Sequence, residues 1–366
     1  MQGGDNNWTC PGLSGSQIRG CLVKSETQVD DGATLLIVED DPAMLVAFRD
    51  ILEGEGYVVS TATNGTDALA ALQKDNPDLI MSDISMPGMG GVELYKAVRQ
   101  SPNGAAIPFI FVTARGTRED IFAAKALGVD DYITKPVTSH ELLAAVRARL
   151  QRSDELMLIQ LKAVLRAMAN AIEARAGEYT LRHVEAVNAY TQALGLELDW
   201  TQDDLDALEF GAILHDVGKI GVPEKVLSKT GPLNEDEWAE MRMHTIFGAH
   251  MIEGNPYLES ALPVVRHHHE RWDGGGYPDQ LAGGDIPIGA RLLAVADTFH
   301  AMTSDRPYRA ALSPQEAFQE ILSQSGQQFD PAMVQAFESC WHRGDIAKIH
   351  KSVQSIAEED SIIIAA

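Results

Sequence analysis

"TLLIVEDDPAMLVAFRDILEGEG", from Thr34 to Gly56, decides the fold of the first half of this chain. An unbroken apolar run ends in three acids, and a helical stretch follows that closes with glycine. Runs that are apolar at every position are typical of parallel strands covered by helices on both faces. The acids fall where the strand ends, which is the edge at which sheets of this kind bind ligands.

The same alternation continues to about residue 152. "YVVSTAT", "PDLIMSD", "IPFIFVTA" and "VDDYITKP" are further strand candidates separated by helical stretches. This order predicts an α/β fold with a doubly wound, five-stranded parallel sheet. The strand ends carry three acids, a threonine and a lysine, namely Glu39, Asp40, Asp83, Thr113 and Lys135. Converging carboxylates repel each other unless a hard cation such as Mg²⁺ holds them, and a nearby lysine suits a phosphoryl group.

Residues 33–152 resemble a response-regulator receiver domain. The acid pair, "DLIMSDISMPGMGG", "VTA" and "ITKP" carry the resemblance. It implies that Asp83 accepts a phosphoryl group from a cognate sensor histidine kinase, and that Asp83 binds Mg²⁺ together with Glu39 and Asp40. It further implies a phosphorylation switch made of Thr113, Tyr132 and Lys135, with Tyr132 as the aromatic switch residue.

Composition limits the remaining possibilities. The formal net charge of -24 argues against binding to DNA, and no apolar run of about 18 residues appears, so we expect no membrane insertion. Three scattered cysteines fit a reducing, cytoplasmic setting. Residues 1–32 are rich in small polar residues and predict a disordered leader, and residues 356–366 form a short tail.

Residues 153–175 predict a connecting helix between two domains. It carries apolar residues at alternating spacings of three and four, namely Leu158, Leu161, Leu165, Met168 and Ile172. Two interpretations stay open, because the seam is under three heptads long. The seam packs on its own domain, or it pairs with a second chain and makes a homodimer.

"EFGAILHDVGKIG", from Glu209 to Gly221, opens the chemistry of the second half. His215 and Asp216 interrupt an apolar helix, which is costly unless a partner such as a metal compensates them. Lys219 follows one turn later on the same side, where it could meet a phosphate or an acid. Other candidate donors are His183, His244, His268, His269 and Asp297. Together they outnumber the ligands of one metal and suit two, and donors without thiolate favour Fe, Mn or Zn.

Residues 156–355 resemble the HD-GYP family of metal-dependent phosphohydrolases. "HDVGK", "HHERWDGGGYPDQLAGGDIP", "ARLLAVAD" and "SDRPYR" carry the resemblance. It implies an all-α HD-type domain that hydrolyses cyclic di-GMP to pGpG, and in some members on to GMP. The metal ligands it implies are His183, His215, Asp216, His244, His268, His269 and Asp297. It assigns the substrate phosphates to Arg306 and Arg309 and links the Gly-Tyr-Pro region to GGDEF-type partner proteins.

The sequence departs from this family at three positions. Gly177 stands where many members have aspartate, with Glu178 beside it, and Tyr179 replaces a glutamate ligand of trinuclear members. We therefore expect two metals, Fe or Mn, and pGpG as the main product. His300 replaces a second aspartate; it could accept a proton, donate to a metal, or mark a weakened enzyme.

Two further histidines are expected to lie outside the ligand set. His267 has no matching role in the family and is expected to pack or to support the ligands. His250, one and a half turns past His244, is expected to be solvated.

Three functions fit the sequence. The leading one is a phosphorylation-controlled cyclic di-GMP phosphodiesterase in which Asp216, Lys219 and His300 act in catalysis and Lys219 also contacts substrate. The second is a catalytically weak sensor that binds the nucleotide and acts through protein contacts. The third is a hydrolase of another cyclic dinucleotide or of pGpG itself.

Overall fold

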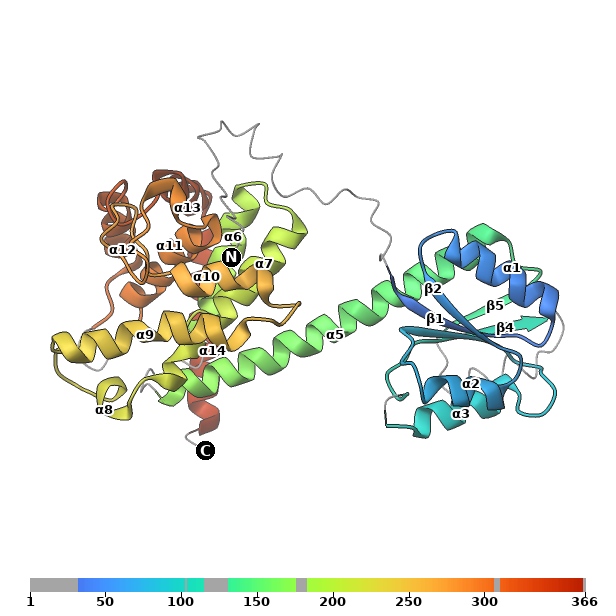
Figure 1. Ribbon diagram of the computed structural model, residues 1–366. Helices are drawn as coiled ribbons and strands as arrows, with labels where there is room; N and C mark the ends of the chain where they lie inside the picture. Colours follow the sequence, from blue (N-terminus) through green and yellow to red (C-terminus); the bar gives the residue numbers. More distant parts are fainter. Residues whose placement is uncertain (1–31, 103, 115–130, 176–182, 306–309, 365–366) are drawn as a thin grey trace, which may run out of the picture. The chain divides into compact units, whose positions relative to one another are not determined.

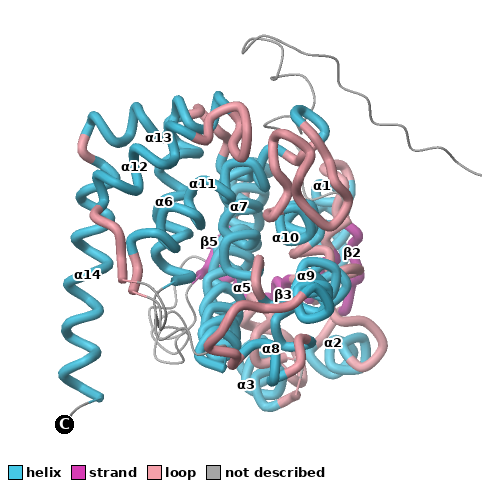
Figure 2. The backbone as a smooth tube through the Cα atoms, turned by 90° about the vertical axis from the view of Figure 1, so that its left-hand side faces the viewer, coloured by secondary structure: helices cyan, strands magenta, loops and turns pink. Residues whose placement is uncertain are grey.

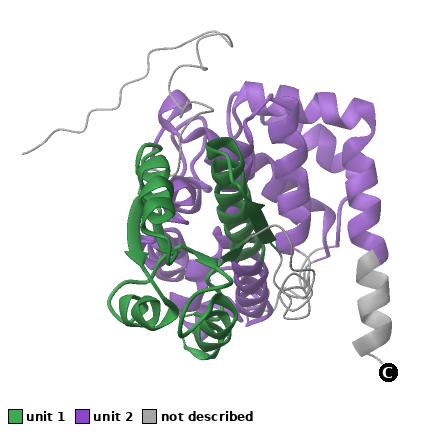
Figure 3. Cartoon of the chain, turned by 90° about the vertical axis from the view of Figure 1, so that its right-hand side faces the viewer, with its two compact units in different colours: residues 1–159 green, residues 160–366 purple. Residues whose placement is uncertain are grey.

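The computed structural model describes residues 32–102, 104–114, 131–175, 183–305 and 310–364. The chain divides into two compact units, residues 1–159 and 160–366, shown in different colours in Figure 3. The leader before Gly32 lies outside the described residues. So do five residues discussed above, namely Gly177, Glu178, Tyr179, Arg306 and Arg309.

The first unit contains the predicted five-stranded parallel sheet (Figure 1). The strands are β1 (Thr34–Val38), β2 (Val58–Ala62), β3 (Leu79–Asp83), β4 (Phe109–Ala114) and β5 (Asp131–Lys135). Their order is β2-β1-β3-β4-β5, and every neighbouring pair is parallel. This order brings the ends of β1 and β3 side by side, so the acids that follow them converge at one edge.

Helices cover both faces of this sheet, as the apolar runs predict. Leu35 and Ile37 of β1 pack with α1 (Pro42–Glu53) and the start of α5, whereas Leu36 and Val38 pack with α2 (Gly65–Leu72) and α3 (Gly91–Gln100). Asp41 caps α1, because its Oδ1 accepts a hydrogen bond of 2.8 Å from Ala43 N. Asp41 is therefore used as a helix cap, and Glu39 and Asp40 are the two acids left to form a site at the edge of the sheet.

The connecting helix is not a separate element. Helix α5 runs without interruption from Ser139 to Arg175 and crosses the division between the units at Ile159. The stretch from Leu150 to Leu156, "LQRSDEL", holds no proline or glycine to end the helix. The five apolar residues of the predicted seam differ in burial. Ile172 is buried, Leu158, Leu161 and Leu165 are half-buried, and Met168 is 52% exposed.

The described part of the second unit is mostly helical, as expected. Its elements are α6 (His183–Glu197), α7 (Gln202–Leu214), η2 (Val217–Gly221), α8 (Glu224–Leu227), α9 (Glu235–Ile252), η3 (Glu259–Ala261), α10 (Leu262–His267), η4 (Gly283–Asp285), α11 (Ile288–Thr303), α12 (Pro314–Ser323), α13 (Pro331–Arg343) and α14 (Asp345–Ile364). Helix α6 packs against both α7 and α11 (Figure 2). Tyr190, Phe299 and Phe337 lie in the core between these elements and α13. No helix among the described residues is long and apolar enough to cross a membrane.

Candidate metal centre

The seven predicted donors of the second unit come together. His183 begins α6, His215 and Asp216 follow α7, His244 lies on α9, His268 and His269 follow α10, and Asp297 lies on α11. Their donor atoms form two groups in which all atoms lie within 4.8 Å of one another. One group is Asp216, His244, His268 and His269, and the other is His183, His215 and Asp297. We call the seven residues the cage.

Asp216 lies between the two groups of the cage. Its Oδ2 is 3.2 Å from His215 Nε2, and its Oδ1 is 3.3 Å from His244 Nε2. His183 Nε2 lies 3.2 Å from His215 Nε2 and 3.5 Å from Asp297 Oδ1. Buried Oδ1 of Asp216 forms no hydrogen bond to the described residues. A buried carboxylate oxygen without a hydrogen bond is unfavourable, and binding to a cation would compensate it.

Three of the histidines are oriented in the same way. Nδ1 of His215, His244 and His268 lies 2.9, 2.8 and 2.8 Å from the carbonyl oxygen three residues earlier, on Ala212, Met241 and Val265. A ring that donates from Nδ1 to a carbonyl keeps its proton there and presents Nε2 as a lone pair. The helical turns that end at these histidines therefore fix each ring through Nδ1 and leave Nε2 as the atom that could bind a metal.

Burial sets the protonation of the cage. Burial lowers the pKa of His268 well below its ordinary value and lowers the pKa of His269 to about 4, so both rings are neutral at pH 7. Burial would also lower the pKa of His215, but the Asp216 carboxylate outweighs this effect and raises it to about 9, so a metal would have to displace the Nε2 proton of His215. Burial works against the charged form of Asp216 too, yet Lys219 and His215 hold its pKa well below the usual range. The centre of the cage therefore attracts positive charge.

His300 lies behind a ligand rather than among the donors. Its buried ring approaches His183 with Nδ1, 3.0 Å from His183 Nδ1, and its Nε2 is 3.2 Å from Ser304 Oγ. His183 keeps Nε2 for the cage, so one of the two Nδ1 atoms donates to the other. This contact favours a role for His300 in orienting His183 or sharing its proton over a role as an additional metal donor.

Sequence reasoning missed one residue of the centre, Glu173 on α5. Glu173 is 3% exposed, and its Oε1 lies 3.3 Å from Lys219 Nζ. Lys219 Nζ is also 2.8 Å from Asp216 Oδ2. Of the two partners predicted for Lys219, a phosphate or an acid, the structure therefore contains the acid. The only sequence signal is its spacing, because Glu173 lies four residues after Ala169 and beside Ile172, both apolar, and this spacing alone does not mark an acid as buried.

Both histidines expected outside the ligand set lie apart from the cage groups. His267 Nε2 is 2.9 Å from Asp279 Oδ2, a carboxylate that Arg266 also binds, so His267 supports the loop after α10. The His250 side chain is 83% exposed and pairs with Glu253. Tyr277 of the Gly-Tyr-Pro region stacks on ligand His269, with ring centroids 4.9 Å apart.

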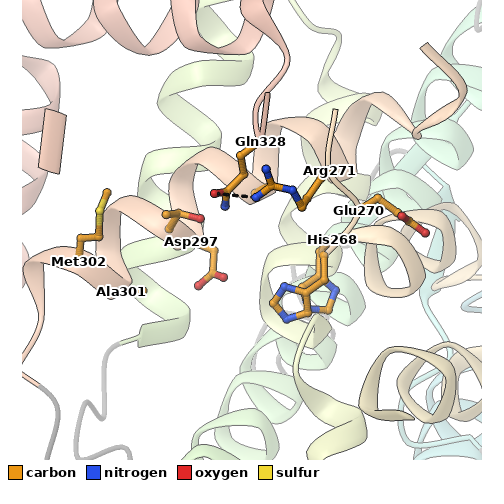
Figure 4. Close-up of a pocket in the computed structure, with 10 residues that line it drawn as sticks. His268, Glu270, Arg271, Asp297, Ala301, Met302 and Gln328 are labelled. Carbon is orange, nitrogen blue, oxygen red and sulfur yellow. Dashed lines mark hydrogen bonds between the residues drawn. The ribbon is translucent and has the colours of Figure 1, made fainter. Parts of the chain in front are cut away.

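A cavity of about 380 Å³ opens beside the cage. Asp297, His268, Arg271 and Gln328 line it, and Figure 4 shows the first two below Arg271 and Gln328, which are joined by a hydrogen bond of 3.3 Å. His269, Glu270 and Met302 also line it. A cavity that contains donors of both cage groups gives a ligand direct access to them.

The receiver residues also meet at one edge of their sheet. Glu39 is 1% and Asp83 8% exposed, and Lys135 Nζ lies 2.8 Å from Glu39 Oε2 and 2.5 Å from Asp83 Oδ2. Glu39, Asp40 and Asp83 form a further group of possible ligands. Burial raises the pKa of Glu39. Thr113 is buried on β4, whereas the predicted aromatic switch Tyr132 on β5 is 40% exposed.

Gly218 sets the distance between η2 and α9, and its replacement is expected to be costly. A Cβ atom at Gly218 would lie 1.9 Å from His244 O and 2.4 Å from Gly248 N. Since both are backbone atoms, we expect Gly218→Ala to lower the free energy of unfolding by about 3 kcal/mol. Gly231→Ala is the control, because nothing lies within 4 Å of its Cβ position. Denaturant titrations test this; equal stability of the two variants would contradict the packing.

Comparison with known proteins identifies both units. Residues 35–147 match the response regulator receiver domain, and residues 163–333 match the HD domain. The cyclic di-GMP phosphodiesterase response regulator RpfG of Xanthomonas campestris is 33% identical over 332 residues, which cover 84% of this chain and 88% of that protein. A probable cyclic di-GMP phosphodiesterase of Vibrio cholerae is 34% identical over 340 residues, 83% of this chain and 77% of that protein.

A third relative matches the second unit alone. The 3'3'-cGAMP-specific phosphodiesterase 2 of Vibrio cholerae is 35% identical over 176 residues, 48% of this chain and 34% of that protein. The two matched domains, and two relatives that align over most of both chains, lead to one conclusion. The chain belongs to the family of response regulators that join a receiver domain to an HD-type phosphodiesterase domain.

Proposed function

We propose that this chain hydrolyses cyclic di-GMP to linear pGpG at two divalent metal ions, and that phosphorylation of Asp83 controls the reaction. The observation that carries the proposal is the cage, in which donors from separate helices meet around Asp216. Burying so many imidazole and carboxylate groups without cations is unfavourable. The names of relatives that align over most of this chain support the substrate.

The two groups of the cage would each hold one ion, with Asp216 shared between them. Imidazole and carboxylate donors without thiolate favour Fe, Mn or Zn, of which we propose Fe or Mn. When bound, such ions supply a water-derived nucleophile at neutral pH and offset negative charge on the phosphate. The Nε2 lone pairs of His244 and His268 support this assignment, and His215 would present its own once a metal displaced the Nε2 proton.

The chain's own residues would bind the substrate and stabilise its charge. The Lys219 ammonium, held beside Asp216, would neutralise a phosphate oxygen as charge develops there. Arg306 and Arg309 are proposed to bind the substrate phosphates through their planar guanidinium groups. Nδ1 of His300 would accept a hydrogen bond from the Nδ1–H of His183 and keep that ring in place.

We propose pGpG as the main product rather than GMP. Tyr179 stands where trinuclear members of the HD-GYP family carry a glutamate ligand, which leaves two ion positions. The shared Asp216 lies between two groups of donors and supports the same number. A site that holds two ions suits a single cleavage followed by release.

The receiver domain would connect this activity to a signal. We propose that this chain acts in the cytoplasm and that a cognate sensor histidine kinase phosphorylates Asp83, with Mg²⁺ held by Glu39, Asp40 and Asp83. The exposed apolar residues Ile159 and Val164 of α5 support pairing with a second copy of the chain. A GGDEF-type protein would bind near the Gly-Tyr-Pro region.

A time course of nucleotide hydrolysis tests the proposal. Full-length protein is loaded with Mn²⁺, or with Fe²⁺ without oxygen, and cyclic di-GMP and pGpG are separated by liquid chromatography. We expect pGpG to accumulate with the wild type and not with Asp216→Ala at equal protein concentration. If the wild type forms no more pGpG than Asp216→Ala, the enzyme proposal fails and a nucleotide sensor becomes the better account.

A second candidate is hydrolysis of 3'3'-cGAMP, because a phosphodiesterase specific for it matches the second unit. The same time course with 3'3'-cGAMP and with pGpG as substrates separates the two. We expect a higher kcat/KM for cyclic di-GMP. A higher value for 3'3'-cGAMP would reassign the substrate and leave the cage unchanged.

A further inference from the structure

The second half of α5 is fixed to its own unit by ion pairs. Lys162 Nζ lies 2.8 Å from Asp206 Oδ1 and 2.7 Å from Glu209 Oε2, both on α7. Arg166, one turn later, also pairs with Glu209. Each of these side chains is partly removed from solvent, so the pairs hold α5 against the helix that ends at His215.

Two residues in the last turn of α5 form hydrogen bonds to η2 and to the residue that follows it. Arg175 donates to two carbonyl oxygens, Ile220 O at 2.9 Å from Nη1 and Val222 O at 3.3 Å from Nη2. Glu173, half a turn earlier, accepts a hydrogen bond from Lys219 Nζ at 3.3 Å. Helix α5 therefore binds the 3-10 segment that follows Asp216 through both its backbone and its lysine side chain.

The Lys219 ammonium contacts two carboxylates from different parts of the fold, Glu173 on α5 and Asp216 before η2. Its Nζ lies 2.8 Å from Asp216 Oδ2 and 3.3 Å from Glu173 Oε1. The Lys219 side chain is 12% exposed and that of Glu173 is 3% exposed, so water does little to screen the pair. A long, flexible side chain with one carboxylate partner could swing about it, whereas two fixed partners define the place of the ammonium.

We propose that Glu173 is a positioning residue that holds the Lys219 ammonium at the edge of the cage. This inference rests on the proposed function, because it gives Lys219 its place beside the reacting phosphate. Glu173 contacts neither substrate nor nucleophile in this account and acts through Lys219. It also makes α5 part of the centre.

A competing interpretation makes Glu173 itself a metal ligand. Donor atoms of Glu173, His183 and Asp216 lie within 4.8 Å of one another, which is close enough for one ion. The Lys219 ammonium lies within 3.3 Å of both carboxylates, so a positive charge already compensates them. This favours the positioning role, and metal content distinguishes the two.

Glu173 lies on the helix whose first half belongs to the receiver core. Helix α5 begins at Ser139, and Leu142, Val146 and Leu150 from its first half are buried in the receiver core. Glu173 lies on the same uninterrupted helix.

Kinetics on four full-length proteins tests the inference: wild type, Glu173→Gln, Lys219→Met and the double variant. We expect Glu173→Gln to lower kcat about 10- to 100-fold, and Glu173→Asp to recover part of it. On the Lys219→Met background, the Glu173→Gln change should alter kcat less than about twofold, because its target is gone. Glu197→Gln is the matched control and should keep the kcat of the wild type, since Glu197 is a partly buried acid that pairs with Arg343 on α13.

Two measurements besides turnover complete the test. Metal content should be equal in the wild type and Glu173→Gln, whereas acetylation of Lys219 by a reactive ester, followed by mass spectrometry, should become faster in Glu173→Gln. An equal loss of kcat with and without Lys219, a lower metal content, or unchanged acetylation would each overturn the positioning role. If the wild type cleaves no cyclic dinucleotide, the proposed function fails, while the acetylation rates still decide whether Glu173 holds Lys219.

Discussion

His244→Ala is expected to lower turnover of cyclic di-GMP roughly 10³-fold or more, because it removes a donor from the group that shares Asp216. His244 is 2% exposed and lies 3.3 Å from Asp216 through Nε2, with Nδ1 fixed on the Met241 carbonyl. An alanine offers no lone pair there. The remaining donors of this group would hold an ion weakly, so the bound metal should fall from about two ions to about one per chain.

His250→Ala is the matched control on the same helix. His250 also lies on α9, but its side chain is 83% exposed and pairs only at the surface with Glu253. We expect its turnover and metal content to equal those of the wild type. The kinetics are measured at saturating Mn²⁺, together with elemental analysis of the protein. If both histidine variants lose activity equally, or neither does, the cage is not the catalytic site.

Asp83→Asn is expected to abolish phosphoryl transfer from acetyl phosphate to the chain. Asp83 is the buried carboxylate at the end of β3, and it lies 2.5 Å from Lys135 Nζ. An amide has nearly the same size as the carboxylate but cannot form the acyl phosphate. The wild type should take up one phosphoryl group in the presence of Mg²⁺, and Asp83→Asn should take up none, as read by intact-protein mass spectrometry.

The same variant tests the control of the second unit. If phosphorylation shifts a population of conformations, turnover of the wild type changes with phosphodonor and that of Asp83→Asn does not. Asp75→Asn, at an exposed position after α2, is the control and should behave as the wild type. Identical turnover of wild type and Asp83→Asn, with and without phosphodonor, would contradict control by the receiver.

The receiver fold could be predicted because its signals are local. Apolar strands such as "TLLIV" and "LIM" are buried on both faces, and the acids after them are placed by the geometry of a parallel sheet. Lys135, far along the chain from Glu39, still fell at the same edge because each strand ends there. The position of Tyr132 was less predictable, since side-chain exposure depends on neighbouring elements rather than on strand order.

The cage could also be predicted, but its supports could not. Histidine and aspartate at the ends of apolar helices are rare enough to stand out in the sequence. Glu173 did not stand out, because an acid in a charged helix looks solvated until the partner element is known. The same holds for His300, whose contact with His183 joins residues 117 positions apart. Continuity of α5 depends on the absence of a break, which the sequence between Leu150 and Leu156 allowed without requiring it.

Anomalous X-ray diffraction from crystals of the manganese-loaded chain tests the central proposal most directly. We expect two anomalous peaks in the second unit. One should lie against His183, His215 and Asp297, the other against His244, His268 and His269, with Asp216 bound to both. A single peak, or none within bonding distance of Asp216 after full loading, would contradict the proposed two-metal phosphodiesterase site.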